Sequence, residues 1–246
     1  MRVIDAALGL LILSTGSAFA DCLQRTNITL IGRDLPLASD ASDVAKATLA
    51  LPYAAMFPFV KTDAAPPGFE RGPGPRDILT GRAPFLAAIS GFDPAAFVSC
   101  HGRAVVIVID GLIDFDLRDY ITAALRRAAG GASPQGLRYT AAIMAAYPDH
   151  DITIIGHSAG GDVASYVAGA FGLPSITFNA APSEASRTGN DGARQLNVIV
   201  VGDPIADRTP LPGMTLYLDV ESERPHQVVT LLDGLAELVG RSWPGA

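Results

Sequence analysis

The chain has 246 residues, of which 49% are hydrophobic and 17% are charged. This balance is that of a globular protein and excludes intrinsic disorder along the whole chain. The formal charge of -7, from 18 basic and 25 acidic residues and with no basic run, excludes the electrostatic footprint of a nucleic-acid-binding protein.

The first 20 residues have the pattern of a secretory signal peptide. Arg2 is followed by an apolar stretch at residues 6–13 and by the small-x-small site Ala18-Phe19-Ala20. That stretch is too short to cross about 30 Å of hydrocarbon. We therefore expect a mature chain of residues 21–246 and a secreted or periplasmic location. Very few of the basic residues are lysines, a bias that favours a bacterial source.

Two cysteines, Cys22 and Cys100, remain after such cleavage. In an oxidising compartment they could pair in a disulfide bond that ties the N-terminus to the body of the protein. The alternative is two unpaired thiols, because spacing in sequence does not bring two Cα atoms within bridging distance. Without a nearby pair of histidines they do not favour a zinc site, and we expect no metal.

Before residue 104 the signals for regular structure are weak. Residues 28–31 predict a short strand, and residues 42–56 have a helical composition that Pro52 interrupts. Residues 57–77 carry five prolines and several glycines, which predicts a surface loop.

From residue 104 onward, strand-like and helix-like segments alternate. Residues 104–109 form a continuous β-branched run, typical of a strand buried on both faces. The other predicted strands are 152–155, 175–178, 196–201 and 214–220, and the predicted helices are 117–129, 135–147, 162–171 and 227–239. This alternation predicts one α/β domain over residues 21–246, with a mostly parallel central sheet flanked by helices.

The strongest motif is the segment from Gly156 to Gly161, which matches G-x-S-x-G between a predicted strand and a predicted helix. A sharp turn there would hold Ser158 as an exposed nucleophile, with His157 as the variable residue of the motif. The helix that follows would aim its N-terminal N–H groups at developing negative charge. The alternative is a glycine-rich turn without catalysis.

A serine nucleophile needs a base and an acid that orients the base. His226 is the only histidine after Ser158, so it is the candidate base. Asp203 follows a predicted strand and is the candidate acid, with Asp207 as its nearest competitor and Asp219 and Glu221 as further alternatives. Asp162 is more simply a first-turn residue that favours the helix dipole.

Acyl transfer also needs N–H donors for the tetrahedral oxyanion. The candidate donors are Ala159, directly after the serine, and Leu112, just past the strand at residues 104–109. The segment Asp110-Gly111-Leu112 could equally form a tight turn.

These motifs resemble those of the class 3 lipases in the α/β-hydrolase superfamily, over about residues 100–235. The resemblance is carried by Tyr147-Pro148-Asp149, by residues 152–161, by residues 175–182 and by Asp203-Pro204-Ile205. It implies an α/β-hydrolase fold, with Ser158 as nucleophile, Asp203 as acid and a later histidine, here His226, as base.

One segment departs from the family. The family's oxyanion strand typically ends in Arg-Gly followed by Ser or Thr, whereas this chain has Asp110-Gly111-Leu112 and so lacks a side-chain hydroxyl at the oxyanion hole. The following lid segment, residues 113–117, is short and partly acidic, and it does not predict interfacial activation.

Together these features predict an exported serine carboxylic ester hydrolase, of lipase or esterase type, that acts through an acyl-enzyme on Ser158. Its partner would be an ester or lipid substrate, with transient contact to a lipid surface, and the chemistry needs no metal or organic cofactor. A phospholipase or an acyltransferase would use the same residues. The alternative outside catalysis is a secreted binding protein on a hydrolase scaffold.

Overall fold

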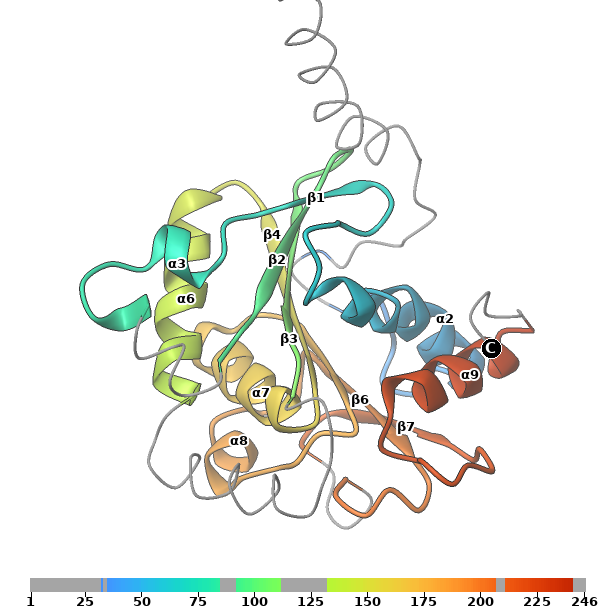
Figure 1. Ribbon diagram of the computed structural model, residues 1–246. Coiled ribbons are helices and arrows are strands. Elements are labelled where there is room, and N and C mark those ends of the chain that lie inside the picture. Colours follow the sequence, from blue (N-terminus) through green and yellow to red (C-terminus); the bar gives the residue numbers. More distant parts are fainter. Residues whose placement is uncertain (1–31, 33–34, 85–91, 112–131, 207–210, 241–246) are drawn as a thin grey trace, which may run out of the picture.

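Runs of β-branched residues form the centre of the molecule, as their sequence predicts. The computed structural model describes residues 32, 35–84, 92–111, 132–206 and 211–240. Within these residues, seven strands form one sheet in the order of the sequence (Figure 1). The strands are β1 Phe69–Arg71, β2 Ala95–Ser99, β3 Ala104–Ile109, β4 Asp151–His157, β5 Ser175–Phe178, β6 Gln195–Val200 and β7 Met214–Leu218.

The strand order decides which helix covers which face of the sheet. Strands β3 to β7 are parallel, whereas β1 and β2 join the sheet antiparallel. Right-handed crossovers between parallel strands that always step in one direction place their helices on one face. The crossover helices there are α6 Ala132–Ala146, α7 Ala159–Phe171 and α8 Glu184–Thr188.

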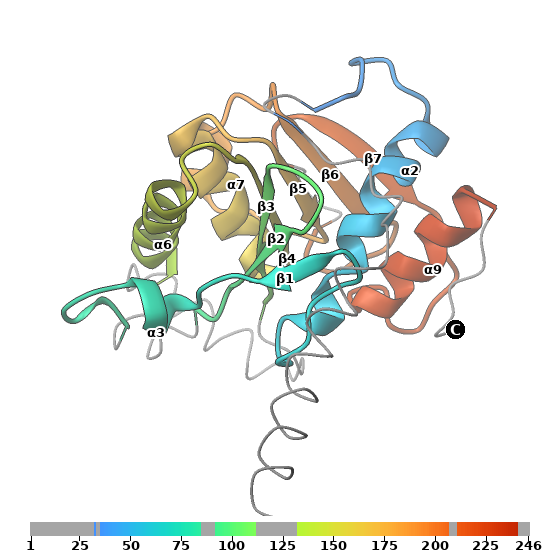
Figure 2. The same ribbon diagram turned by 90° about the horizontal axis from the view of Figure 1, so that it is seen from above.

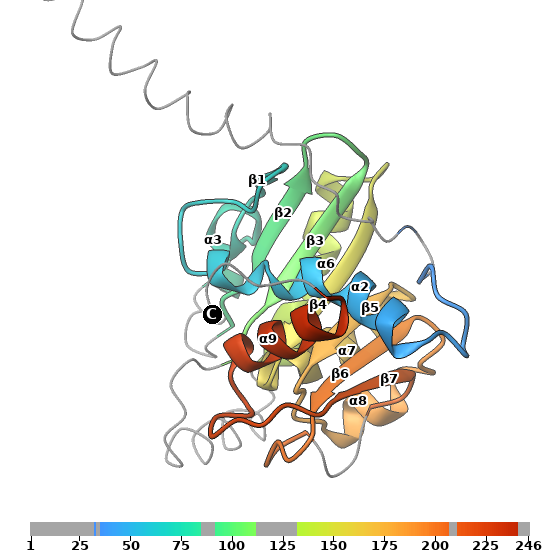
Figure 3. The ribbon, with the colours of Figure 1, turned by 90° about the vertical axis from the view of Figure 1, so that its right-hand side faces the viewer.

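The opposite face is covered by helices from near the two ends of the chain. Helix α2, Asp43–Ala54, lies before the sheet in sequence and α9, Val228–Leu238, lies after it. They pack against each other across this face (Figures 2 and 3). The short helices η1, Phe57–Phe59, and α3, Pro75–Ile78, flank β1 in sequence.

Strand β3 shows why the sheet needs cover on both faces. Its alternate residues Val106 and Val108 belong to the core beneath α2 and α9, whereas Val105 and Ile107 belong to the core beneath α6 and α7. Successive side chains of a strand point to opposite faces, so an unbroken apolar run serves two cores. The structure confirms the predicted α/β fold with a mostly parallel sheet flanked by helices.

Several local predictions are wrong. Residues 57–77 are not only a loop, because they contain η1, β1 and the start of α3. Pro52 does not interrupt α2, which continues to Ala54. Strand β2 and helix α8 were not predicted, and the segments 28–31 and 117–129 lie outside the described residues.

Helix α6 is tied to the segment after β1 by one buried tyrosine. The ring of Tyr139 is fully buried, and its hydroxyl donates a 2.7 Å hydrogen bond to the Pro73 carbonyl. Burial raises the pKa of the Tyr139 phenol well above its ordinary value of 10. The neutral phenol is therefore the form that the folded state favours.

We predict that Tyr139→Phe lowers the free energy of unfolding by about 1–3 kcal/mol at pH 7, because the Pro73 carbonyl loses its donor. Since the pKa is raised in the folded state, this stabilisation is present below about pH 10 and is lost as the pH rises further. Urea unfolding of both proteins should show their difference shrinking above pH 10. Tyr217→Phe, at a residue that is 47% exposed, is the control. It should change neither the free energy of unfolding nor its dependence on pH.

Candidate active site

The three residues predicted to form a catalytic triad lie together at the carboxyl edge of the sheet. Ser158 follows β4, Asp203 follows β6, and His226 lies in the connection between β7 and α9. Carboxyl ends of parallel strands meet at one edge, which is where open α/β sheets gather their functional groups. Segments up to 68 residues apart in sequence are thereby brought into contact.

Ser158 forms a sharp turn between β4 and α7. Its backbone has φ 55° and ψ -124°, a strained conformation for a residue other than glycine. Its N–H donates to the Phe178 carbonyl at 3.0 Å, and its carbonyl accepts from the Ala181 N–H at 3.0 Å. These bonds to the segment at and after β5 hold the strained turn in place. The predicted strand-turn-helix context of the motif is therefore confirmed.

The glycines of the motif let three backbone segments cross closely. A Cβ atom on Gly156 would collide with the backbone of Gly160, and a Cβ on Gly160 would collide with the Ile109 carbonyl at the end of β3. The start of α7 therefore lies against the ends of both β3 and β4.

The expectation that Ser158 is exposed is wrong, because this residue is only 2% exposed.

His226 contacts both other members of the predicted triad. Its Nδ1 lies 2.7 Å from Oδ2 of Asp203, and its Nε2 lies 2.8 Å from the Ser158 hydroxyl oxygen. An ionised carboxylate only accepts, so Nδ1 carries the proton and Nε2 is left to accept from the serine hydroxyl. The Ser158 hydroxyl makes no capping hydrogen bond to α7. His226 Nε2 is therefore placed to take the proton of this hydroxyl.

Backbone donors hold the carboxylate of Asp203 in place. Its side chain is fully buried, and Oδ1 accepts the N–H groups of Ile205 and Ala206, both at 2.8 Å. Oδ2 is thereby left for His226. The competitor Asp207 lies outside the described residues.

Asn179 holds the connection that carries His226. This residue has φ 42° and is fully buried at the end of β5. Its Nδ2 donates to the Pro225 carbonyl at 2.8 Å, while its Oδ1 accepts the Val200 N–H at 2.9 Å. The sequence analysis included Asn179 only as part of residues 175–182, one of the segments that carry the family resemblance, and assigned no role to it.

Sequence reasoning missed the contacts of His157. Its Nδ1 lies 3.2 Å from Oδ1 of Asp110, and its Nε2 lies 2.8 Å from the backbone carbonyl of His226. His157 occupies the variable position of the motif, yet its ring has two specific contacts to which the sequence analysis assigned no role. The register offers a signal: Ile109 pairs with Gly156 in the parallel ladder, so the next residues along, Asp110 and His157, end up side by side.

Of the two predicted oxyanion donors, the structure describes one. Ala159 is the first residue of α7, so its N–H has no acceptor within the helix. Leu112 lies outside the described residues. Gly111, which precedes it, lies close to Ser158. A Cβ atom on Gly111 would lie 2.8 Å from the Ser158 Cβ and 3.2 Å from its Oγ.

Other predicted features lie at or beyond the limits of the description. Cys100 follows β2, whereas Cys22 and residues 1–20 lie outside the described residues. Pairing of the two cysteines stays a prediction. Asp162 lies in the first turn of α7, as predicted, and accepts from the Ser183 N–H at 2.7 Å.

Among the described residues, no group of three or more His, Cys, Asp or Glu side chains could hold a metal ion. No helix there has both the length and the apolar character needed to cross a membrane.

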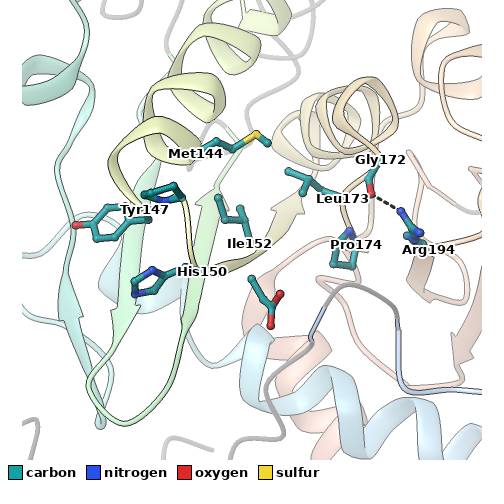
Figure 4. Close-up of a pocket in the computed structure, with 10 residues that line it drawn as sticks. Met144, Tyr147, His150, Ile152, Gly172, Leu173, Pro174 and Arg194 are labelled. Carbon is teal, nitrogen blue, oxygen red and sulfur yellow. Dashed lines mark hydrogen bonds between the residues drawn. The ribbon is translucent and has the colours of Figure 1, made fainter.

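A hollow of about 340 Å³ lies at the opposite edge of the sheet (Figure 4). It is lined in part by Asp151 at the start of β4, Pro174 just before β5 and Arg194 just before β6. Arg194 donates to the Gly172 carbonyl at 2.6 Å. Because these residues precede the strands that Ser158 and Asp203 follow, the hollow is separate from the candidate active site.

Comparison with known proteins finds similar chains among solved structures. No protein-family model matches the chain, and a search among curated proteins finds no match. A triacylglycerol lipase from Penicillium expansum is 15% identical, with a TM-score of 0.46, over 78% of this chain and 88% of that chain. The Rhizomucor miehei lipase in complex with its propeptide is 11% identical, with a TM-score of 0.48, over 82% and 79%.

A mutant form of MDLA from Penicillium cyclopium is 12% identical, with a TM-score of 0.43, over 89% of this chain and 82% of that chain. At such identities and TM-scores, these similarities bear on neither the site nor the activity of this chain.

Proposed function

We propose that this chain is a serine hydrolase of carboxylic esters, lipid esters included. The observation that carries the proposal is the continuous contact from Asp203 through His226 to Ser158, at 2.7 Å and 2.8 Å. A serine hydroxyl becomes nucleophilic when a positioned base removes its proton, and the order Ser, Asp, His along the chain is that of α/β-hydrolases.

In the first half of the reaction, His226 Nε2 takes the proton of Ser158 as Oγ attacks the ester carbonyl carbon. The negative charge that develops on the carbonyl oxygen is stabilised by the N–H of Ala159 and, we propose, by that of Leu112. Collapse of the tetrahedral intermediate breaks the bond to the alcohol, which takes the proton from His226. Ser158 is then acylated.

In the second half, His226 removes a proton from water, which attacks the acyl carbon. The second tetrahedral intermediate releases the carboxylic acid, and the proton returns to Ser158. Asp203 stays ionised throughout and stabilises the imidazolium that forms in each half. These steps use side chains, backbone N–H groups and water, and they need no metal or organic cofactor.

The proposal extends to export. Residues 1–20 would be removed as a signal peptide, which leaves residues 21–246 as one mature domain in the periplasm or the medium. Disulfide pairing of Cys22 with Cys100 fits such a compartment. If an alcohol reaches the acyl-enzyme in place of water, the same residues perform acyl transfer.

The first test is hydrolysis of p-nitrophenyl esters of short and long acyl chains by residues 21–246. We predict turnover that Ser158→Ala reduces by about 10⁴-fold or more. A fluorophosphonate probe should label the wild type and not this variant. Ser99→Ala, at the far end of β2, is the control and should keep both activity and labelling. Absence of both turnover and labelling in the wild type would favour the non-catalytic binding protein.

The base predicts a pH dependence. An imidazole that has gained a second proton can no longer accept one from the serine. We therefore predict that kcat/KM declines along a single acid limb as the pH falls. A flat profile would contradict the role of His226.

The close approach of Gly111 to Ser158 predicts a third result. Gly111→Ala would bring its Cβ to 2.8 Å from that of Ser158, so the serine or the end of β3 must shift. We predict a loss of kcat of about 100-fold, on the scale of a displaced oxyanion donor. Gly74→Ala is the control, since its Cβ would meet only the flexible Asp77 carboxylate at 3.3 Å. Wild-type turnover in Gly111→Ala would show that the space is not needed.

A further inference from the structure

We propose that His157 and Asp110 form an imidazolium-carboxylate pair that positions the base, His226. The inference rests on the proposed function and adds two positioning residues to it. Neither residue contacts the hydroxyl of Ser158 in the way His226 does. They act on the backbone of the connection that carries His226.

The two neighbours of the His157 ring fix the number of its protons. The backbone carbonyl of His226 only accepts, so the Nε2 that lies 2.8 Å from it carries a proton. A neutral imidazole would then present a bare Nδ1 lone pair to the Asp110 carboxylate at 3.2 Å, and the two would repel. A second proton on Nδ1 turns this repulsion into an ion pair.

The contacts of Asp110 favour the same assignment. Its Oδ1 also accepts the N–H of Gly111 at 2.8 Å, so one oxygen faces two donors. An ionised carboxylate is suited to this, since it accepts at several lone pairs and donates at none. The side chains of His157 and Asp110 are only 10% and 13% exposed, so water screens the pair weakly.

Three elements surround the His157 ring. The end of β3 contributes Asp110, and the connection before α9 contributes the ring of His226, whose centroid is 5.1 Å away and whose charged partner is Asp203. Helix η1 contributes Phe57, which packs edge-on at 5.9 Å and carries no charge. Among the contacts of His157 in the described residues, Asp110 and His226 are the groups that titrate.

The consequence for His226 is mechanical. Two consecutive carbonyls of its connection are held: that of Pro225 by Asn179, and that of His226 itself by His157. Fixing both carbonyls fixes the two peptide planes that flank the Cα atom of His226. The ring is thereby aimed at Ser158 before any substrate arrives, which reduces the ordering needed in the reaction.

The consequence is also electrostatic. A positive charge on His157 opposes the uptake of a proton by His226, whereas the Asp203 carboxylate favours it. Removing the charge on His157 while keeping Asp110 should therefore move the acid limb of the activity profile to higher pH. For unit charges about 5 Å apart, with screening intermediate between that of bulk water and that of a pair near a protein surface, the shift is about one pH unit.

The proton count is tested first, by NMR of ¹⁵N-histidine-labelled residues 21–246 at pH 7. We expect both ring nitrogens of His157 to carry protons, with the signals assigned by their loss in His157→Gln. A single ring proton on His157 would overturn the proposal. This measurement needs no turnover, so a protein that proves inactive removes the proposed function while the ion pair is judged separately.

Positioning is tested with three variants. His157→Phe keeps a ring but no donor, and we expect kcat to fall about 10- to 100-fold with KM within twofold. His157→Gln keeps a donor for the His226 carbonyl and should recover most of kcat, yet its acid limb should shift up by about one pH unit. Asp110→Asn removes the carboxylate of the ion pair and should lower kcat, but by less than His157→Phe does, because Nε2 of a neutral His157 still donates to the His226 carbonyl.

The results that contradict positioning are distinct. Wild-type kcat in His157→Phe would show that the bond to the His226 carbonyl is not needed. An acid limb that stays within 0.2 pH units of the wild type in His157→Gln would show that His157 carries no charge. If His157→Phe fails to fold, the glutamine variant and the proton count still decide the matter.

Discussion

The site depends on one close crossing of backbones. The start of α7 lies against the ends of β3 and β4, with no side chain between them, because Gly156 and Gly160 have none. Any Cβ at either position would force the helix away from the sheet. Ser158 would then leave its strained turn, and the contacts to His226 would lengthen. The contacts among Ser158, His226 and Asp203 thus depend on the absence of a Cβ atom at Gly156 and Gly160.

The order of strands adds a second constraint. Because β3 to β6 step in one direction, their helices gather on one face, and the other face must be covered by α2 and α9. The same order sends the carboxyl ends of β4 and β6 to one edge, which brings Ser158 and Asp203 together. His226 completes the site because α9 must return across the sheet immediately after it.

Much of this could be predicted from sequence where the signal is local. The β-branched run of β3 predicts a strand because burial on two faces requires such residues. The small residues around Ser158 predict a tight turn because larger side chains would not fit there. Strand β1 could not be predicted, because Phe69–Arg71 is a strand only through its pairing with β2. The prediction that Pro52 interrupts the helix was wrong because burial of the last turn of α2 outweighs the one backbone hydrogen bond that a proline cannot donate.

The partners of His157 illustrate the same limit at the site. A motif describes neighbours in sequence, whereas Asp110 lies 47 residues before His157 and the carbonyl of His226 lies 69 residues after it. Only the register of β3 against β4 brings them into contact. The contact of Ser158, Asp203 and His226 could be predicted because the order rule for such residues spans the whole chain and leaves a single histidine after Ser158.

The position of His226 two residues before α9 has a consequence for the order of events during synthesis. A ribosome makes Ser158 and Asp203 well before His226, and the helix that follows His226 is the last described element of the chain. That helix packs on α2, the first described helix in the sequence (Figure 3). A growing or shortened chain that ends before residue 228 therefore holds Ser158 without an anchored His226. The proposed reactivity would arise only when α2 and α9 have met.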